Sequence, residues 1–192
     1  MMRQLYDAHA DQLRTALDAL ADQADVMEAA AAAMADTLRG GGRVLAAGNG
    51  GSAAEAQHFT AELLGRLRPD RDREPLGAIA LHADTSTLTA AGNDYGYDEV
   101  FARQVRGLGR PGDSLLALST SGSSRNVVRA VEDARDMGMV SIGLVGGREA
   151  ALHELCDHVI AVPSTEIGAI QECHLVLVHV LVERTEDLLG LF

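Results

Sequence analysis

Bulky aromatic side chains are nearly absent from this sequence. Among its 192 residues there is no Trp, and aromatic residues make up 3% of the chain, whereas apolar residues as a class make up 47%. The interior must therefore be built from Ala, Val, Leu and Ile. A chain of this length suits one domain with a substantial core. No internal repeat or linker divides it, so we expect a single domain over residues 1–192.

Basic residues, cysteines and long apolar runs are also few. Lys and Arg number 16 against 28 Asp and Glu, a net charge of −12, which argues against a nucleic-acid partner. Cys156 and Cys173 lack metal or redox spacing, and we expect them to be reduced and structural. No apolar run approaches the roughly 20 residues that span a bilayer, and the start of the chain lacks a signal-peptide pattern. We therefore expect a cytoplasmic protein without a membrane partner.

Residues 3–39 have the composition of a helix that precedes the rest of the domain. They are rich in Ala, Leu, Asp, Glu and Gln, contain no Pro or Gly, and stop at three consecutive glycines, 40–42. Leu13, Leu17 and Leu20 form an apolar stripe at helical spacing. Such an arm (residues 1–40) packs on another subunit or folds back over the core, so it favours an oligomer.

After residue 42 short apolar strands alternate with helices. Strands are predicted at 43–47, 77–81, 114–118, 140–145 and 158–162, and helices at 52–66, 84–91, 97–108, 124–137 and 168–189. This order predicts an α/β three-layer sandwich with a central parallel sheet. Ligands of such sheets bind beyond the carboxyl ends of the strands. Three loops with unusual residues are expected at that edge: 48–52, 92–94 and 119–124.

The loop at 119–124, with the sequence STSGSS, follows one of these strands and precedes a helix. Its hydroxyls and backbone N–H groups, together with the positive end of the helix, would stabilise an anion such as phosphate. Alternatively, its serines merely cap the helix.

The loop that begins at Gly48 has the sequence GNGGSA, which matches a dinucleotide-binding fingerprint. That interpretation needs an acidic residue about 20 positions on, at the end of the second strand. The second predicted strand ends near Leu81, too far along the chain, so the glycines favour a smaller polyol or phosphate ligand.

Two of the predicted helices carry residues that do not indicate a function individually. His58 and Glu62, at i and i+4, could share a metal ion or a substrate, or form a surface pair. Gln171 and His179 share a face of the last predicted helix and could bind a ligand there. Because their neighbours are apolar, His179 could instead be a buried core histidine. Asp94 could cap a helix or accept hydrogen bonds from sugar hydroxyls.

The motifs AAGNGGSAAEAQHFTAEL, AGNDYGYDEVFARQV, LSTSGSSRNVVRA and IQECHLVLVHVL, in this order and spacing, resemble the bacterial phosphoheptose isomerases. These are sugar-isomerase (SIS) domain proteins of the flavodoxin-like type, and the resemblance covers nearly the whole chain. It implies a homotetramer with active sites between subunits. It also implies conversion of sedoheptulose 7-phosphate to D-glycero-D-manno-heptose 7-phosphate in nucleotide-activated heptose synthesis.

The resemblance further implies one zinc ion per subunit, with His58, Glu62, Gln171 and His179 as ligands. The substrate contacts that it implies are Asn49, Gly50, Gly51, Ser52, Glu62, Asn93, Asp94, Ser119, Thr120, Ser121, Ser124 and Gln171. Aldose–ketose isomerisation moves a proton between adjacent carbons through an enediol(ate), so Glu62 suits the general base and His179 the acid/base partner at the oxygens.

Two other functions use the same sequence features. A noncatalytic SIS protein of the type that binds the bacterial replication initiator would share the glycine loop, but such relatives tend to lose the acid/base pair. An isomerase of another phosphosugar would use the same residues. Two segments depart from the family pattern: the short loop after Val145 and the arginine-rich stretch at 66–74.

Overall fold

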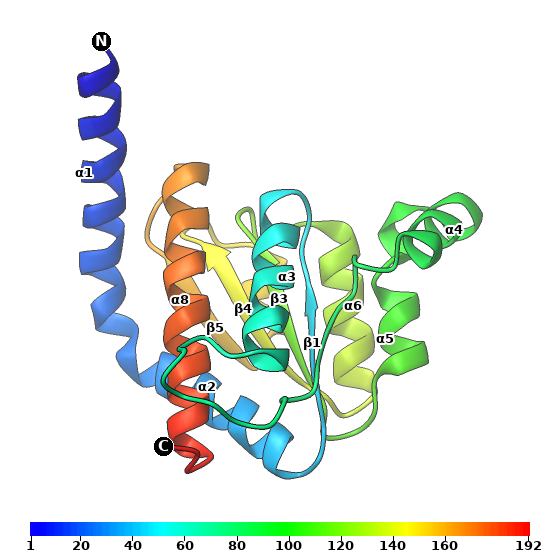
Figure 1. Cartoon of the computed structure of the whole chain (residues 1–192). Coiled ribbons are helices and arrows are strands. Elements are labelled where there is room, and N and C mark those ends of the chain that lie inside the picture. The colour runs from blue at the N-terminus through cyan, green and yellow to red at the C-terminus, as the bar shows by residue number, and fades with distance from the viewer.

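The computed structural model describes all residues, 1–192, and has one parallel sheet at its centre (Figure 1). Its strands are β1 (Val44–Ala47), β2 (Ala78–Ala80), β3 (Ser114–Ser119), β4 (Val140–Gly146) and β5 (His158–Val162). They lie in the order β2-β1-β3-β4-β5, and every neighbouring pair is parallel. The strand order reverses between β1 and β3, and such a switch point opens a crevice at the carboxyl edge of the sheet.

Helices cover both faces of the sheet, and each face has its own apolar core. Alternate residues of β1 point to opposite sides, so Val44 belongs to one core and Leu45 to the other. The first core is closed by α2 (Ala24–Arg39), α3 (Gly51–Leu64) and α8 (Ile167–Leu188), and the second by α5 (Ala102–Leu108), α6 (Arg125–Asp136) and α7 (Ala151–Leu155). The predicted three-layer fold is confirmed.

The N-terminal arm is not the single helix that its composition predicts. Helix α1 (Met2–Leu20) is followed by a 3-10 turn, Ala21–Gln23, after which α2 runs in a different direction beneath the sheet (Figure 1). The side chain of Gln23 donates to the Ala161 carbonyl of β5 (2.6 Å) and accepts from the Ala161 N–H (2.9 Å). The break therefore follows from a long-range contact with the edge strand. The free end of α1 extends away from the domain and leaves Leu5 and Tyr6 more than half exposed.

The segment after β2 also differs from the prediction. Helix α4 (Thr85–Tyr95) begins at Asp84, whose carboxylate accepts from the Thr87 N–H (3.0 Å), and ends at Gly96, which has φ +87°. The expected turn at 92–94 is therefore wrong, because this stretch is helical. The predicted helix at 97–108 is a 3-10 turn, Tyr97–Glu99, followed by α5, and α7 was not predicted.

Both cysteines are free and buried, as expected. Burial raises the pKa of the Cys156 thiol to about 12 and that of Cys173 to about 11. They are therefore thiols at neutral pH and serve packing rather than catalysis. No helix combines the length and apolar character that crossing a membrane would need.

Candidate active site

The hydroxyls of the loop between β3 and α6 converge on one another. Ser119, at the end of β3, has its Oγ 3.0 Å from Ser124 Oγ and 3.3 Å from Ser121 Oγ. The tight turn between them uses Gly122 at φ +65°. Ser124 stands at the N-cap of α6, yet its hydroxyl makes no capping bond to the helix. The first N–H groups of α6 thus keep no side-chain cap, which suits an anion site better than a capped helix.

A cavity of about 650 Å³ opens beside this loop. Its lining includes Thr120, Ser121, Ser123 and Ile170, and Arg148 supplies a positive charge. Arg148 forms no ion pair with a carboxylate of the chain, so its guanidinium is available to an anion. Arg148 was not among the residues predicted from the sequence, although it belongs to the short loop after Val145. A second cavity of equal volume, lined by Ala78, Ala91 and Leu108 among others, lies away from these polar groups, and we place the site at the first.

The glycine loop after β1 needs its small residues. A Cβ at Gly48 would lie 2.6 Å from the Ser52 carbonyl oxygen, and one at Gly51 would lie 2.3 Å from Gln171 Nε2. Gly50 has φ +57° and stands at the N-cap of α3. Ser52 is buried in the first turn of that helix. The loop thus packs directly against α8, and its glycines allow the close contact with Gln171.

Asn49 links the two loops at the switch point. Its amide forms reciprocal hydrogen bonds with Asn126 of α6, both 2.8 Å, and its Oδ1 also accepts from the Tyr97 hydroxyl at 3.1 Å. Asn126 and Tyr97 were not among the residues predicted from the sequence. Asn126 lies two positions after Ser124, and this nearness to the serine loop is the only local signal of its role.

His58, Glu62 and His179 meet between α3 and α8. His58 Nε2 lies 2.8 Å from His179 Nε2, so one ring donates a hydrogen bond and the other accepts it. His58 Nε2 also lies 3.4 Å from Glu62 Oε1. The Glu62 side chain is only 16% exposed, against 40% for His58. A carboxylate and two imidazoles therefore share one partly enclosed space, where protons can pass between them.

Gln171 lies farther toward the start of α8. It precedes His179 by eight positions, about 12 Å along a helix, and its amide packs on Gly51. Within one chain the fold therefore places Gln171 beside the glycine loop and the histidine pair two turns away. His174, between them, is fully buried and lies 3.3 Å from the Val145 carbonyl oxygen, which makes it a core histidine.

The histidine pair offers donors of the kind that zinc takes. Imidazole nitrogen and carboxylate oxygen are common zinc ligands, and Glu62 adds an oxygen to two nitrogens. Two nitrogens on one tetrahedral zinc would lie about 3.3 Å apart, so a gap of 2.8 Å is too short without a small movement of one ring. Accordingly, no group of three or more His, Cys, Asp or Glu side chains is already arranged as a metal cage. The donor set fits the metal, and its present arrangement is a hydrogen-bonded pair.

Asn93 and Asp94 make no hydrogen bond to the rest of the predicted site. Both are exposed near the end of α4, where the Asn93 amide donates to the Asp94 carboxylate at 2.7 Å. Neither contacts the serine loop or the glycine loop through a side-chain hydrogen bond. Hydrogen bonds within one chain therefore give no support to their place among the substrate contacts, which stays a prediction.

Comparisons with known proteins agree with this geometry. Residues 8–146 match the family model described as SIS domain. A phosphoheptose isomerase of Rhodospirillum rubrum is 51% identical over 170 residues, covering 88% of this chain and 89% of the relative. One of Shewanella loihica is 47% identical, covering 97% and 95%. The solved structure of a phosphoheptose isomerase from Francisella tularensis has a TM-score of 0.92 at 39% identity, covering 97% of this chain and 99% of that one. The chain therefore belongs to the phosphoheptose isomerase family of SIS domain proteins.

Proposed function

We propose that this protein is an aldose–ketose isomerase that converts sedoheptulose 7-phosphate to D-glycero-D-manno-heptose 7-phosphate. The observation that carries this proposal is the meeting of Glu62, His58 and His179 between α3 and α8, in a domain that also has a serine-rich loop at its switch point. Its curated and solved relatives bear the name phosphoheptose isomerase. The product would feed nucleotide-activated heptose synthesis.

The phosphate end of the substrate would be held by the loop between β3 and α6. Ser119, Ser121 and Ser124 offer hydroxyls, Thr120 lines the cavity, and Arg148 offers a cation. A protein with a net charge of −12 needs such a local site to attract a phosphosugar. Binding energy gained at the phosphate would orient the distant carbonyl carbon.

The chemistry at the carbonyl end needs two proton-handling groups. Glu62 would remove a proton from C1 of the ketose, and the protonated Glu62 would then return a proton to C2 of the resulting enediol(ate). His179 would donate a proton to O2 and take the proton from O1, with His58 hydrogen-bonded to it as the adjoining donor or acceptor. Every proton removed is returned, so the reaction needs no oxidant or reductant.

We also propose one zinc ion per subunit, held by His58, Glu62, Gln171 and His179. When bound, zinc would act as a Lewis acid on the sugar carbonyl oxygen. Gln171 lies too far along α8 to join the histidine pair without a change in the arrangement described here. If zinc takes the Glu62 carboxylate as a ligand, the same oxygen cannot simultaneously remove a carbon-bound proton.

A homotetramer in the cytoplasm, with active sites between subunits, completes the proposal. The exposed apolar side chains on α1 support it, because Leu5 and Tyr6 lack partners within the chain. The noncatalytic alternative is not favoured, because Glu62 and His179 are both present and converge on His58.

Incubation of the purified protein with sedoheptulose 7-phosphate tests the proposal. We expect NMR spectra to show an aldoheptose 7-phosphate and, in D₂O, deuterium at C2 of the product, because the proton that Glu62 holds exchanges with solvent before it is returned to carbon. Turnover of another ketose phosphate in place of this one would redirect the proposal to that substrate. If no phosphosugar is isomerised, the enzymatic assignment is wrong.

A further inference from the structure

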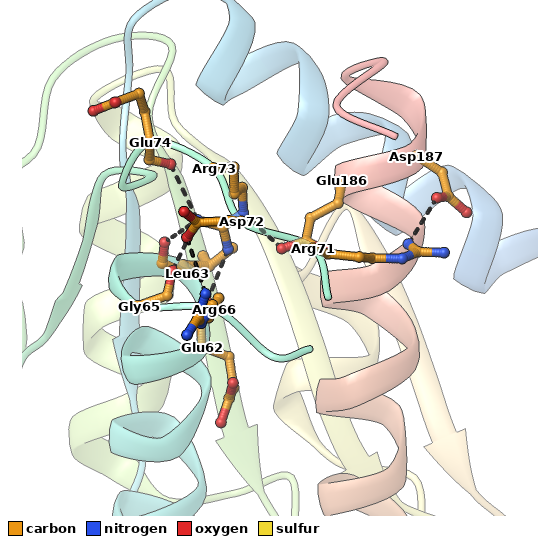
Figure 2. Close-up of polar contacts among 10 residues, drawn as sticks. All are labelled: Glu62, Leu63, Gly65, Arg66, Arg71, Asp72, Arg73, Glu74, Glu186 and Asp187. Atoms are coloured by element: carbon orange, nitrogen blue, oxygen red, sulfur yellow. Dashed lines mark hydrogen bonds and ion pairs between the residues drawn. The ribbon is translucent and has the colours of Figure 1, made fainter. Parts of the chain in front are cut away.

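The arginine-rich stretch after α3 places one of its arginines inside the protein. The Arg73 side chain is 2% exposed, and its Nε donates to Glu186 Oε1 of α8 at 2.6 Å. The Glu186 side chain is 1% exposed. A fully buried ion pair thus joins the loop at 66–75 to the last helix (Figure 2).

The remaining donors of Arg73 close the end of α3. Its guanidinium donates to the carbonyl oxygens of Glu62 and Leu63, both at 2.9 Å, and of Gly65 at 3.2 Å. The last carbonyls of a helix have no partner within the helix, and a glycine with positive φ commonly supplies the cap. Gly65 has φ −93° and is not such a cap. Arg73 therefore caps the end of α3 together with the Leu76 N–H, which donates to the Leu63 carbonyl at 2.9 Å.

This arrangement holds the main chain of Glu62 and leaves its carboxylate free. Figure 2 shows the Glu62 side chain directed away from Arg73, along α3. Arg73 bonds only the carbonyl of that residue. The guanidinium therefore fixes the position of the Glu62 main chain. It does not pair with the Glu62 carboxylate, which is the group that would act as the base.

A gain in stability is a poor explanation for the buried pair. Removing two charges from water offsets much of their attraction, and apolar replacements of similar size are often as stable. Glu186 Oε2 is buried and has no hydrogen-bond partner, so its acceptor capacity is not fully used. The pair is better explained by the geometry that it imposes.

The two helices that the pair joins are the two that carry the candidate acid/base groups. Glu186 lies seven positions after His179, two turns along the same face of α8. On α3, Glu62 follows His58 by one turn. We propose that Arg73 and Glu186 are positioning residues that hold Glu62 and His58 in register with His179. The catalytic consequence rests on the proposed function, whereas the geometric one does not.

A neighbouring ion pair supplies a matched control. Arg71, on the same stretch, donates to Asp187 of α8 at 3.1 Å, but the two side chains are 27% and 43% exposed. Among the hydrogen bonds of the chain, none joins Arg71 to an α3 carbonyl. Arg71→Met therefore removes a link between the same two segments without uncapping α3.

The test compares Arg73→Met/Glu186→Met, Arg73→Lys and Arg71→Met in the full-length protein. The double variant leaves no unpaired buried charge, but it removes the hydrogen bonds that cap α3, so we expect a folded protein whose Tm is lower by a few degrees. We expect its kcat for the phosphosugar to fall about 10- to 100-fold with KM within about twofold, because a displacement of roughly 1 Å has that effect and the phosphate loop is untouched. Arg73→Lys, which cannot reach all the carbonyls, should lower kcat less. Arg71→Met should leave both constants unchanged.

Imidazole ¹⁵N spectra give a second measurement that does not depend on turnover. We expect the imidazole nitrogen shifts of His58 and His179 to change in the double variant and to be kept in Arg71→Met, both in the metal-free protein, where the two rings share an N–H, and in the zinc-loaded protein. An unaltered spectrum, or unaltered kcat in a folded double variant, overturns the proposal. Glu62→Gln separates the positioning proposal from the proposed function. If this variant turns over the phosphosugar normally, the general-base role of Glu62 is wrong. The spectra alone then decide whether Arg73 and Glu186 position α3.

Discussion

The proposed reaction depends on two groups of side chains with different duties. Ser119 has its hydroxyl within hydrogen-bond distance of those of Ser121 and Ser124. Glu62 and His179, on different helices, both approach His58. The first group would bind the phosphate throughout the reaction, and the second would act only where protons move. Substitutions in the two groups should therefore change different kinetic constants.

We expect Glu62→Gln and His179→Ala each to lower kcat about 10²- to 10⁴-fold, the usual contribution of a general acid or base, with little change in KM. Ser121→Ala should instead raise KM for the phosphosugar and leave kcat within a few fold, because it removes one hydrogen bond to the phosphate. Steady-state kinetics on folded variants decide the matter. A Glu62→Gln variant with near-normal kcat, or a Ser121→Ala variant with unaltered KM, would contradict the corresponding role.

At the scale of elements, the segment between α4 and α6 is held by ion pairs around Glu99. Its carboxylate accepts from Arg106 of α5 at 2.9 Å and from Arg129 of α6 at 3.2 Å. The pKa of Glu99 is held below its ordinary value, mainly by the hydrogen bond from Arg106 and to a smaller extent by that from Arg129. Tyr97, two residues earlier, donates to Asn49 of the glycine loop. These ion pairs therefore anchor a segment that reaches the site.

This lowered pKa has a consequence for stability in acid. The stabilisation by Glu99 is fully present above its pKa in the unfolded chain, about 4.3, and is lost as the pH falls through the lower folded pKa. We expect Glu99→Gln to lower Tm by on the order of 1–4 °C at pH 7. The difference from the unaltered protein should shrink toward zero in strong acid. A difference in Tm that is constant from pH 7 to pH 3 would show that charge is not its cause.

The order of elements was largely predictable from the sequence, but their ends and directions were not. All five strands fall where apolar runs between polar turns predict them, because burial on both faces leaves a continuous apolar signal. The break after α1 was missed, because Gln23 is not a helix-breaking residue and pairs with Ala161, far along the chain. The helical state of Asn93 and Asp94 was missed because Asn and Asp also favour turns.

At the scale of the whole molecule, one experiment tests both the oligomer and the zinc ion. It follows from the exposed apolar side chains of α1 and from the three zinc donors that meet within one chain. Native mass spectrometry of the purified protein should give the mass of four chains and of one zinc ion per chain. Chelation should remove the metal and lower activity, and zinc should restore it, because the donors His58, Glu62 and His179 suit that ion. A fully active monomer would contradict shared active sites, and an active, metal-free oligomer would contradict the zinc proposal.

The sequence by itself determined the layered α/β fold, the two loops at the carboxyl edge and the residue types that isomerisation needs. These follow from local signals, namely apolar runs, glycines and hydroxyls next to strand ends. Only the tertiary structure brought His58 and Glu62 against His179, placed Gln171 beside Gly51, and buried Arg73 against Glu186. Such contacts join segments more than 100 residues apart, and no local pattern encodes them, because they depend on how α3 and α8 pack on the sheet.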